Sequence, residues 1–227
     1  MTIQAVFFDL DGTFADTAPD LGHAINLMRA ARQLPPVPLE KTRPVTSMGA
    51  RGLLGAGFGI TPEHADFPAM RDEFLDLYEN NLCHHTTLFP GMAELLDALE
   101  ARGLKWGIVT NKAERFAIPL IGQLGFGKRA ACIIGGDTTG KLKPHPDSLF
   151  AATKAINVTA SNCIYVGDDE RDVQAGRAAG MCTIAVRYGY LNGSDPALWG
   201  ADAVVDTPMD TLSYLALLGS TRMQNAG

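Results

Sequence analysis

Residues 5–13 read AVFFDLDGT, and this stretch decides the fold. Its first four residues form a continuous apolar run, which is typical of a strand buried on both faces of a parallel sheet. The run ends in Asp9 and Asp11, and Gly12 then allows a tight turn. Because ligands of such sheets bind beyond the carboxyl ends of the strands, the two carboxylates mark a candidate site.

Similar apolar runs recur along the chain between stretches with helical periodicity. The other predicted strands cover residues 105–109, 131–134, 163–166 and 183–186, and predicted helices cover 92–102, 146–156 and 172–179. Strands that alternate with helices indicate an α/β class protein with a doubly wound, Rossmann-like parallel sheet. Gly103 and Gly180 stand where two helices should end, since glycine suits a C-terminal cap. Pro119 interrupts another helical stretch and predicts a kink or a late helix start.

The interval from about Thr17 to His85 breaks this alternation. It contains no convincing strand, and Phe74, Leu77 and Tyr78 follow the spacing of an amphipathic helix, predicted over 73–82. A helical insertion after the first strand suggests a second, smaller domain. The sequence therefore predicts a core domain of residues 1–15 and 86–227 and a helical cap domain of residues 16–85.

The composition limits the possible partners. With 227 residues, 46% of them hydrophobic and 19% charged, the chain fits a globular protein. Its formal charge of -6 argues against a nucleic-acid surface. The first apolar run is too short for a signal peptide or a membrane span, so we expect no membrane partner and a cytoplasmic location. The sequence does not indicate an oligomeric state.

Asp9 and Asp11 suit phosphoryl transfer. One carboxylate can attack phosphorus while the other handles the proton of the leaving group, and covalent attack divides a hard displacement into two easier steps. The alternative is a turn with two solvated acids. Two further strands are followed by groups that suit a phosphate: Thr110 and Asn111 offer a hydroxyl and an amide, and Lys143 offers a cation. Alone, such a threonine is more often a helix cap and such a lysine is solvated.

A dense acidic cluster follows the predicted strand 163–166. Residues 167–172 read GDDERD, and these acids repel one another unless a cation compensates them. Oxygen ligands suit Mg²⁺, so we expect this ion as the cofactor. The alternative is the acidic first turn of a helix, which interacts favourably with the helix dipole.

In this order, the four elements match the motif set of the haloacid dehalogenase superfamily, which the chain resembles over essentially its whole length. It is similar in particular to the phosphoglycolate phosphatase-like branch, through GGD at 135–137, KPHPD at 143–147 and the helical insertion. The resemblance implies a Rossmann-like core with a helical cap. It also implies a Mg²⁺-dependent phosphatase for a small phosphorylated metabolite, with phosphoglycolate as the first expectation.

The resemblance implies a role for each matching residue. Asp9 would be the nucleophile and a Mg²⁺ ligand. Asp11 would be the general acid and later the base, and would bind Mg²⁺ through its backbone carbonyl. Thr110 and Asn111 would hold the transferring phosphoryl group, and Lys143 would stabilise Asp9 and the phosphate.

Other implied roles concern the metal and the cap. Asp168 would bind Mg²⁺, and Asp172 would orient Lys143 or the water shell of the metal. Asp169 stands where many relatives have a small polar residue, so its contact with the metal is open. In the cap, which would close over the site and select the substrate, Arg51 is a candidate for gripping a carboxylate or a second anion, with a solvated arginine as the alternative.

Several alternatives remain open on the same core. The substrate could be a sugar phosphate, including a phosphorylated amino-sugar acid, and a phosphomutase would retain every core motif. Asp11 argues against a dehalogenase, which lacks the second aspartate. A phosphonate hydrolase would need a Schiff-base lysine in the cap, where only Lys41 is present. A regulator that binds phosphate without catalysis is the remaining class, although every expected catalytic position is filled.

Overall fold

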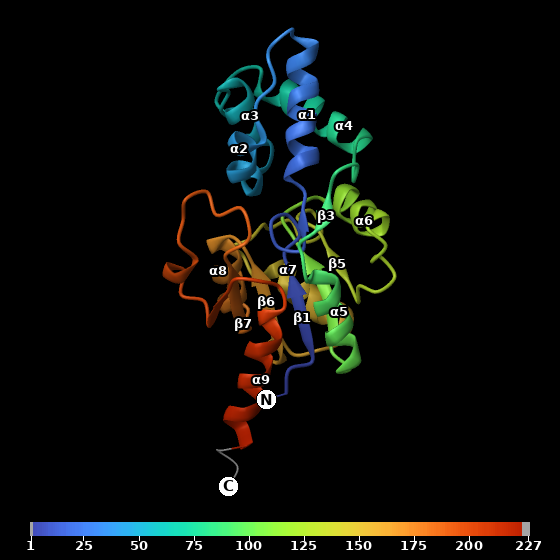
Figure 1. Cartoon of the computed structure of the whole chain (residues 1–227), viewed down its shortest axis with the longest axis vertical. Helices are drawn as coiled ribbons and strands as arrows, with labels where there is room; N and C mark the ends of the chain where they lie inside the picture. Colours follow the sequence, from blue (N-terminus) through green and yellow to red (C-terminus); the bar gives the residue numbers. More distant parts are fainter. Residues whose placement is uncertain (1, 224–227) are drawn as a thin grey trace.

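The computed structural model describes residues 2–223, and Figure 1 shows a sheet with helices around it and a group of helices at one end. The sheet has six strands in the order β5-β4-β1-β6-β7-β8, and every neighbouring pair is parallel. The strands are β1 (Ala5–Phe8), β4 (Lys105–Val109), β5 (Ile133–Ile134), β6 (Cys163–Gly167), β7 (Cys182–Val186) and β8 (Ala203–Val205). The expected α/β class and Rossmann-like parallel sheet are confirmed.

Helices cover both faces of this sheet. They are α5 (Met92–Ala101), α6 (Glu114–Gln123), α7 (Asp147–Ile156), α8 (Glu170–Ala178) and α9 (Asp210–Met223). Val6 and Phe8 of β1 belong to one buried cluster with leucines of α5, whereas Ala5 and Phe7 belong to another with residues of α7 and α8. Successive side chains of a strand point to opposite faces, so the continuous apolar run of β1 fills two cores.

Four helices and a 3-10 turn lie between β2 (Ala15–Asp16) and β3 (Thr87–Leu88). They are α1 (Ala18–Ala31), α2 (Leu39–Thr42), η1 (Arg43–Met48), α3 (Gly49–Phe58) and α4 (Phe67–Asn80). Figure 1 shows them together, beyond one end of the sheet. β2 and β3 form a short antiparallel pair, so the chain leaves and re-enters the sheet region side by side.

Asp20 holds together the two chain segments that connect the sheet with the four helices. This carboxylate is fully buried and accepts hydrogen bonds from the backbone amides of His85 and Thr86 and from the Thr86 hydroxyl. A buried carboxylate needs such donors, so the first turn of α1 is bound to the end of the same helical segment.

The structure departs from the predicted elements in several places. The strand expected over 131–134 is limited to β5, and β8 was not predicted because its apolar run is only three residues long. The helix expected over 73–82 is α4, which begins at Phe67, and α8 begins at Glu170 because the Asp169 side chain caps it. Gly103 and Gly180 have φ angles of 70° and 75°, as expected for C-terminal caps.

Of the two outcomes expected at Pro119, a kink or a late helix start, the late start is wrong. α6 begins at Glu114 and runs through this proline. Phe116, Ala117 and Leu120 of this helix are buried, so their packing outweighs the backbone hydrogen bond that proline cannot make. Among residues 2–223, no helix is long and apolar enough to span a membrane.

Candidate active site

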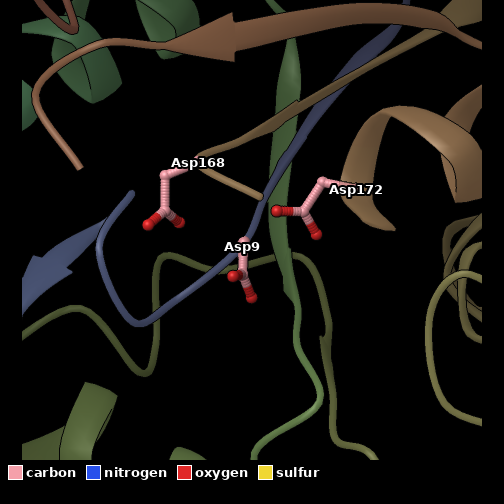
Figure 2. Close-up of side chains that lie close together, drawn as sticks. All are labelled: Asp9, Asp168 and Asp172. Carbon is pink, nitrogen blue, oxygen red and sulfur yellow. The ribbon is translucent and has the colours of Figure 1, made fainter. Parts of the chain in front are cut away.

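Three buried carboxylates meet at the carboxyl ends of the central strands. Asp9 follows β1, Asp168 follows β6, and Asp172 lies in the first turn of α8. Figure 2 shows their side chains grouped together, and one oxygen from each lies within 4.8 Å of the others. The parallel register pairs Phe8 with Val166, which brings the residues after both strands to one edge. The expected grouping of these acids is therefore present.

Lys143 lies beside two of the three carboxylates. Its Nζ is 2.8 Å from Asp9 Oδ1 and 2.6 Å from Asp172 Oδ1, and it donates to the Tyr165 hydroxyl at 2.8 Å. The approach to Asp9 Oδ1 is an ion pair without hydrogen-bond geometry, so this buried oxygen has no hydrogen-bond donor. Burial opposes the charged lysine, but Asp172 and Asp9 outweigh it and raise the pKa of Lys143.

Burial and mutual repulsion disfavour the ionised acids. Burial and the charge of Asp9 raise the pKa of Asp168 well above its usual range. Burial also raises the pKa of Asp172 to about 7, although Lys143 opposes this shift. With one ammonium for three buried carboxylates, ionisation of all three would leave an excess of negative charge.

This donor set fits a divalent cation. Oxygen ligands suit hard cations such as Mg²⁺, and an ion would offset the excess negative charge. Asp9 Oδ1 lacks a hydrogen-bond donor, so it is available as a ligand. Asp168 already accepts bonds from the Thr13 hydroxyl and the Tyr190 amide, both at 2.8 Å, which fix its orientation. Asp172 accepts from the Asp169 amide and pairs with Lys143, so it is largely engaged within the protein.

Gly12 has the conformation and the surroundings that only glycine tolerates. Its φ angle is 89°, in the left-handed region. A Cβ atom at this position would lie 2.2 Å from Asp168 Oδ2. The predicted supporting residue therefore lets the loop after β1 approach Asp168 closely.

The Asp11 side chain lies outside the three-carboxylate group and has partners of its own. It accepts a hydrogen bond of 2.5 Å from the Thr17 hydroxyl, and Lys112 Nζ lies 3.0 Å from Oδ1 and 3.2 Å from Oδ2. Lys112 also lies 4.5 Å from the centroid of the Tyr78 ring in α4. Burial opposes the charged lysine, but Asp11 and the other neighbours outweigh it and raise the pKa of Lys112.

Thr110 and Asn111 follow β4 and line the same cavity. The Thr110 hydroxyl accepts a bond from the Lys112 amide at 3.2 Å, and this threonine is buried. The Asn111 side chain accepts from the Lys143 amide at 2.8 Å and donates to the Lys143 carbonyl at 3.2 Å. Asn111 thus holds the backbone of the lysine that contacts Asp9.

Asp169 is a helix cap. Its carboxylate accepts from the Arg171 amide at 2.9 Å and pairs with the Arg171 guanidinium at 2.7 Å. Burial alone would raise the pKa of Asp169, but the bonds from Arg171 lower it overall. The Arg171 guanidinium also donates to the Ser47 carbonyl in η1 at 2.8 Å. Asp169 lies outside the three-carboxylate group and links the sheet region to the helical segment through Arg171.

A cavity of about 350 Å³ connects these groups with the helical segment. On the sheet side the lining includes Asp9, Asp11, Thr110, Asn111, Lys112, Lys143, Asp169, Arg171 and Asp172, and the helical side is mainly apolar. Its lining there includes Leu21, Met48, Ala50, Phe74, Leu75 and Tyr78. Arg51 is exposed and is not among the lining residues, so its predicted role in substrate binding remains a prediction.

Three residues of the site had no role in the sequence-based interpretation. Lys112 directly follows Thr110 and Asn111, and Arg171 lies within the acidic motif, so position along the chain is the signal for both. Tyr78 was expected only as part of an amphipathic helix. Its place beside Lys112 depends on how the helical segment sits on the sheet.

Comparison with known proteins agrees with this geometry. The sequence profile of the haloacid dehalogenase-like hydrolases matches residues 6–186. An N-acetylmuramic acid 6-phosphate phosphatase of Pseudomonas aeruginosa is 42% identical over 216 residues, which are 95% of this chain and 96% of that protein. A phosphoglycolate phosphatase of Xanthomonas campestris pv. campestris is 46% identical over 206 residues, 90% of this chain and 93% of that protein.

A solved structure has the same fold. It is a protein of Haemophilus somnus 129PT, described as a predicted phosphoglycolate phosphatase, with a TM-score of 0.83 and 26% sequence identity. The match covers 94% of this chain and 98% of that one. The similarity therefore extends over both the sheet and the helical segment.

Proposed function

Because this chain belongs to the haloacid dehalogenase-like hydrolases, we propose that it is a magnesium-dependent phosphatase that forms an aspartyl-phosphate on Asp9. One observation carries this proposal: Asp9 lines the cavity beside Lys143, 2.8 Å away, and within reach of Asp168. Phosphoryl transfer depends mainly on positioning and on neutralising charge, and this arrangement provides both.

Each residue of the site has a defined task in the proposed reaction. An Asp9 carboxylate oxygen attacks phosphorus as the ester P–O bond breaks, and Asp11 gives its proton to the leaving oxygen. Water then attacks the aspartyl-phosphate, Asp11 takes its proton, and phosphate leaves with Asp9 regenerated. Thr110 and Lys143 bind the phosphoryl oxygens, and Asn111 keeps Lys143 in place.

Asp9 and Asp168 offer carboxylate oxygens that would hold a magnesium ion, and the family resemblance adds the backbone carbonyl of Asp11 as a further ligand. When bound, the ion would neutralise charge on the phosphoryl group and reduce its repulsion from the attacking carboxylate. Asp172 holds Lys143 and accepts from the Asp169 amide, which suits a supporting role.

Residues 16–85 are proposed to act as a cap domain on a core of residues 1–15 and 86–227. The apolar side chains of the helical segment that line the cavity would exclude water from the reacting groups. The bond from Arg171 to the Ser47 carbonyl is one contact that would hold the cap in place.

Phosphoglycolate is the first substrate candidate, by similarity to the phosphoglycolate phosphatases. N-acetylmuramic acid 6-phosphate is the second, and the cavity favours it. About 350 Å³ with an apolar wall leaves room for an organic group larger than a two-carbon acid. Small phosphorylated metabolites are in either case the proposed partners, and the expected cytoplasmic location stays a prediction.

Phosphate release from a panel of phosphomonoesters tests this function. The panel contains both candidates, several sugar phosphates and p-nitrophenyl phosphate, each with Mg²⁺ and with EDTA. We expect metal-dependent release that favours one compound, and Asp9→Asn should abolish it while the exposed Asp76→Asn control does not. Absence of release from every compound would overturn the proposal, and recovery of an isomeric phosphate ester instead of free phosphate would identify a mutase.

A further inference from the structure

Lys112 is a second buried ammonium in the cavity, besides Lys143. Its side chain is only 7% exposed, and its Nζ lies within 3.2 Å of both oxygens of Asp11. The Tyr78 ring of α4 covers it at 4.5 Å. A lysine is rarely buried without a partner, because its charge loses hydration. Within residues 2–223, Asp11 is the only carboxylate paired with it.

Lys112 is too far along the chain from Asp11 for their contact to be a local one. It follows β4, whereas Asp11 follows β1, and the two strands are neighbours in the sheet. The Thr17 hydroxyl binds the same carboxylate from the start of the helical segment. Asp11 is thus fixed by two donors from different parts of the fold, which suits a group that must be held in one orientation.

We propose that Lys112 is a positioning residue for Asp11, which holds its carboxyl group and stabilises the negative charge that develops there as the leaving group is protonated. This inference rests on the proposed function. The Tyr78 ring covers the Lys112 ammonium, and opposite charges interact more strongly where water is excluded.

Lys112 is expected to contribute to the first chemical step, in which Asp11 loses its proton. A bond forms between an Asp9 oxygen and phosphorus, the ester P–O bond breaks, and the proton of Asp11 moves to the leaving alkoxide oxygen. Asp11 becomes a carboxylate, and the Lys112 ammonium already lies beside it. A counter-charge that is already in place where negative charge develops stabilises the transition state. p-Nitrophenolate leaves as a stable anion without a proton, so no such charge develops with that substrate.

The test compares kcat/KM for two substrates, because this quantity reports the step that releases the leaving group. One is the alkyl phosphate that the unaltered protein hydrolyses in the panel above, and the other is p-nitrophenyl phosphate, both with Mg²⁺. In Lys112→Met, the ratio of the alkyl to the aryl value should fall at least about tenfold, since a positioned acid contributes roughly 10²–10⁴-fold. In Lys112→Arg, which keeps the positive charge, this ratio should fall less.

Control variants distinguish a positioning role of Lys112 from a purely structural role and from failure of the proposed function. Lys128→Met makes the same change at an exposed position and should leave the ratio unaltered. Lys112→Gln serves if Lys112→Met does not fold, and thermal unfolding checks each variant. An equal loss for both substrates would overturn the inference and leave Lys112 a structural residue. Failure of the proposed function would look different: the unaltered protein would release no phosphate from either compound.

Discussion

The Tyr190 hydroxyl donates a hydrogen bond of 2.6 Å to the Asp16 carboxylate, and so joins the loop after β7 to the strand that leads into the cap. The same hydroxyl accepts from the Ala18 amide at 2.9 Å, and the Tyr190 amide binds Asp168. Tyr190 therefore connects Asp168, a proposed metal ligand, with the start of the helical segment.

Tyr190→Phe should destabilise the protein by about 1–3 kcal/mol, because it leaves the buried Ala18 amide without an acceptor. Denaturant unfolding measures this free energy. Tyr188→Phe is a matched control, since the Tyr188 hydroxyl is buried and has no hydrogen-bond partner. Removal of the Tyr188 hydroxyl should change the free energy of unfolding little, and equal losses of stability in the two variants would contradict the prediction.

Asp11→Asn should reduce kcat by about 10²–10⁴-fold with little change in KM, because an amide can bind Lys112 and Thr17 weakly but cannot transfer the proton. Steady-state kinetics with the preferred alkyl phosphate measures both constants. A rise in KM with unchanged kcat would instead assign Asp11 to substrate binding.

Lys143→Met should remove activity and destabilise the metal-free protein. Breaking a buried ion pair leaves an uncompensated charge, which costs about 3–5 kcal/mol. Lys141→Met is the control: its ion pair with Asp147 is 3.3 Å long and its side chain is 56% exposed. Such a surface pair is worth about 0–1 kcal/mol, so similar unfolding free energies for the two variants would argue against a buried pair at Lys143.

The stability of the metal-free protein should fall as the pH rises between about 4 and 7. Burial raises the pKa of Asp172 from 3.8 to about 7, so in this window the folded state keeps a proton that the unfolded state has lost. Stability decreases with pH wherever the folded state binds more protons. Thermal unfolding without metal measures the slope, which should be smaller in Asp172→Asn. Added Mg²⁺ should restore most stability at the upper end, since it favours the ionised carboxylates.

The sequence predicted the parts of the site that follow directly from strand ends. Asp9 and Asp168 each come after a buried apolar run, and neighbouring parallel strands bring such residues to one edge. The same reasoning placed Thr110, which follows β4, at the edge where the neighbouring strand β1 ends. At Pro119, packing of the buried apolar side chains of α6 keeps the helix continuous. A rule based on local sequence does not include such packing.

Contacts between the cap and the core could not be predicted in this way. Tyr78 approaches Lys112 from a helix that is held in place by packing, and no local pattern specifies that approach. Arg171 illustrates the same limit, because its bond to the Ser47 carbonyl depends on the orientation of the whole helical segment. The sequence left the contact of Asp169 with the metal open, and in the structure its carboxylate caps α8 and binds Arg171.

The pairing of β1 has a consequence for the order in which the chain can fold during synthesis. Ala5 lies beside Lys105 on one side and Cys163 on the other, so β1 is synthesised well before both of the strands with which it pairs. Contacts between residues distant in sequence form slowly, whereas α1 to α4 contact one another within a single continuous segment. The nascent chain should therefore expose an apolar strand while the cap helices are already able to associate.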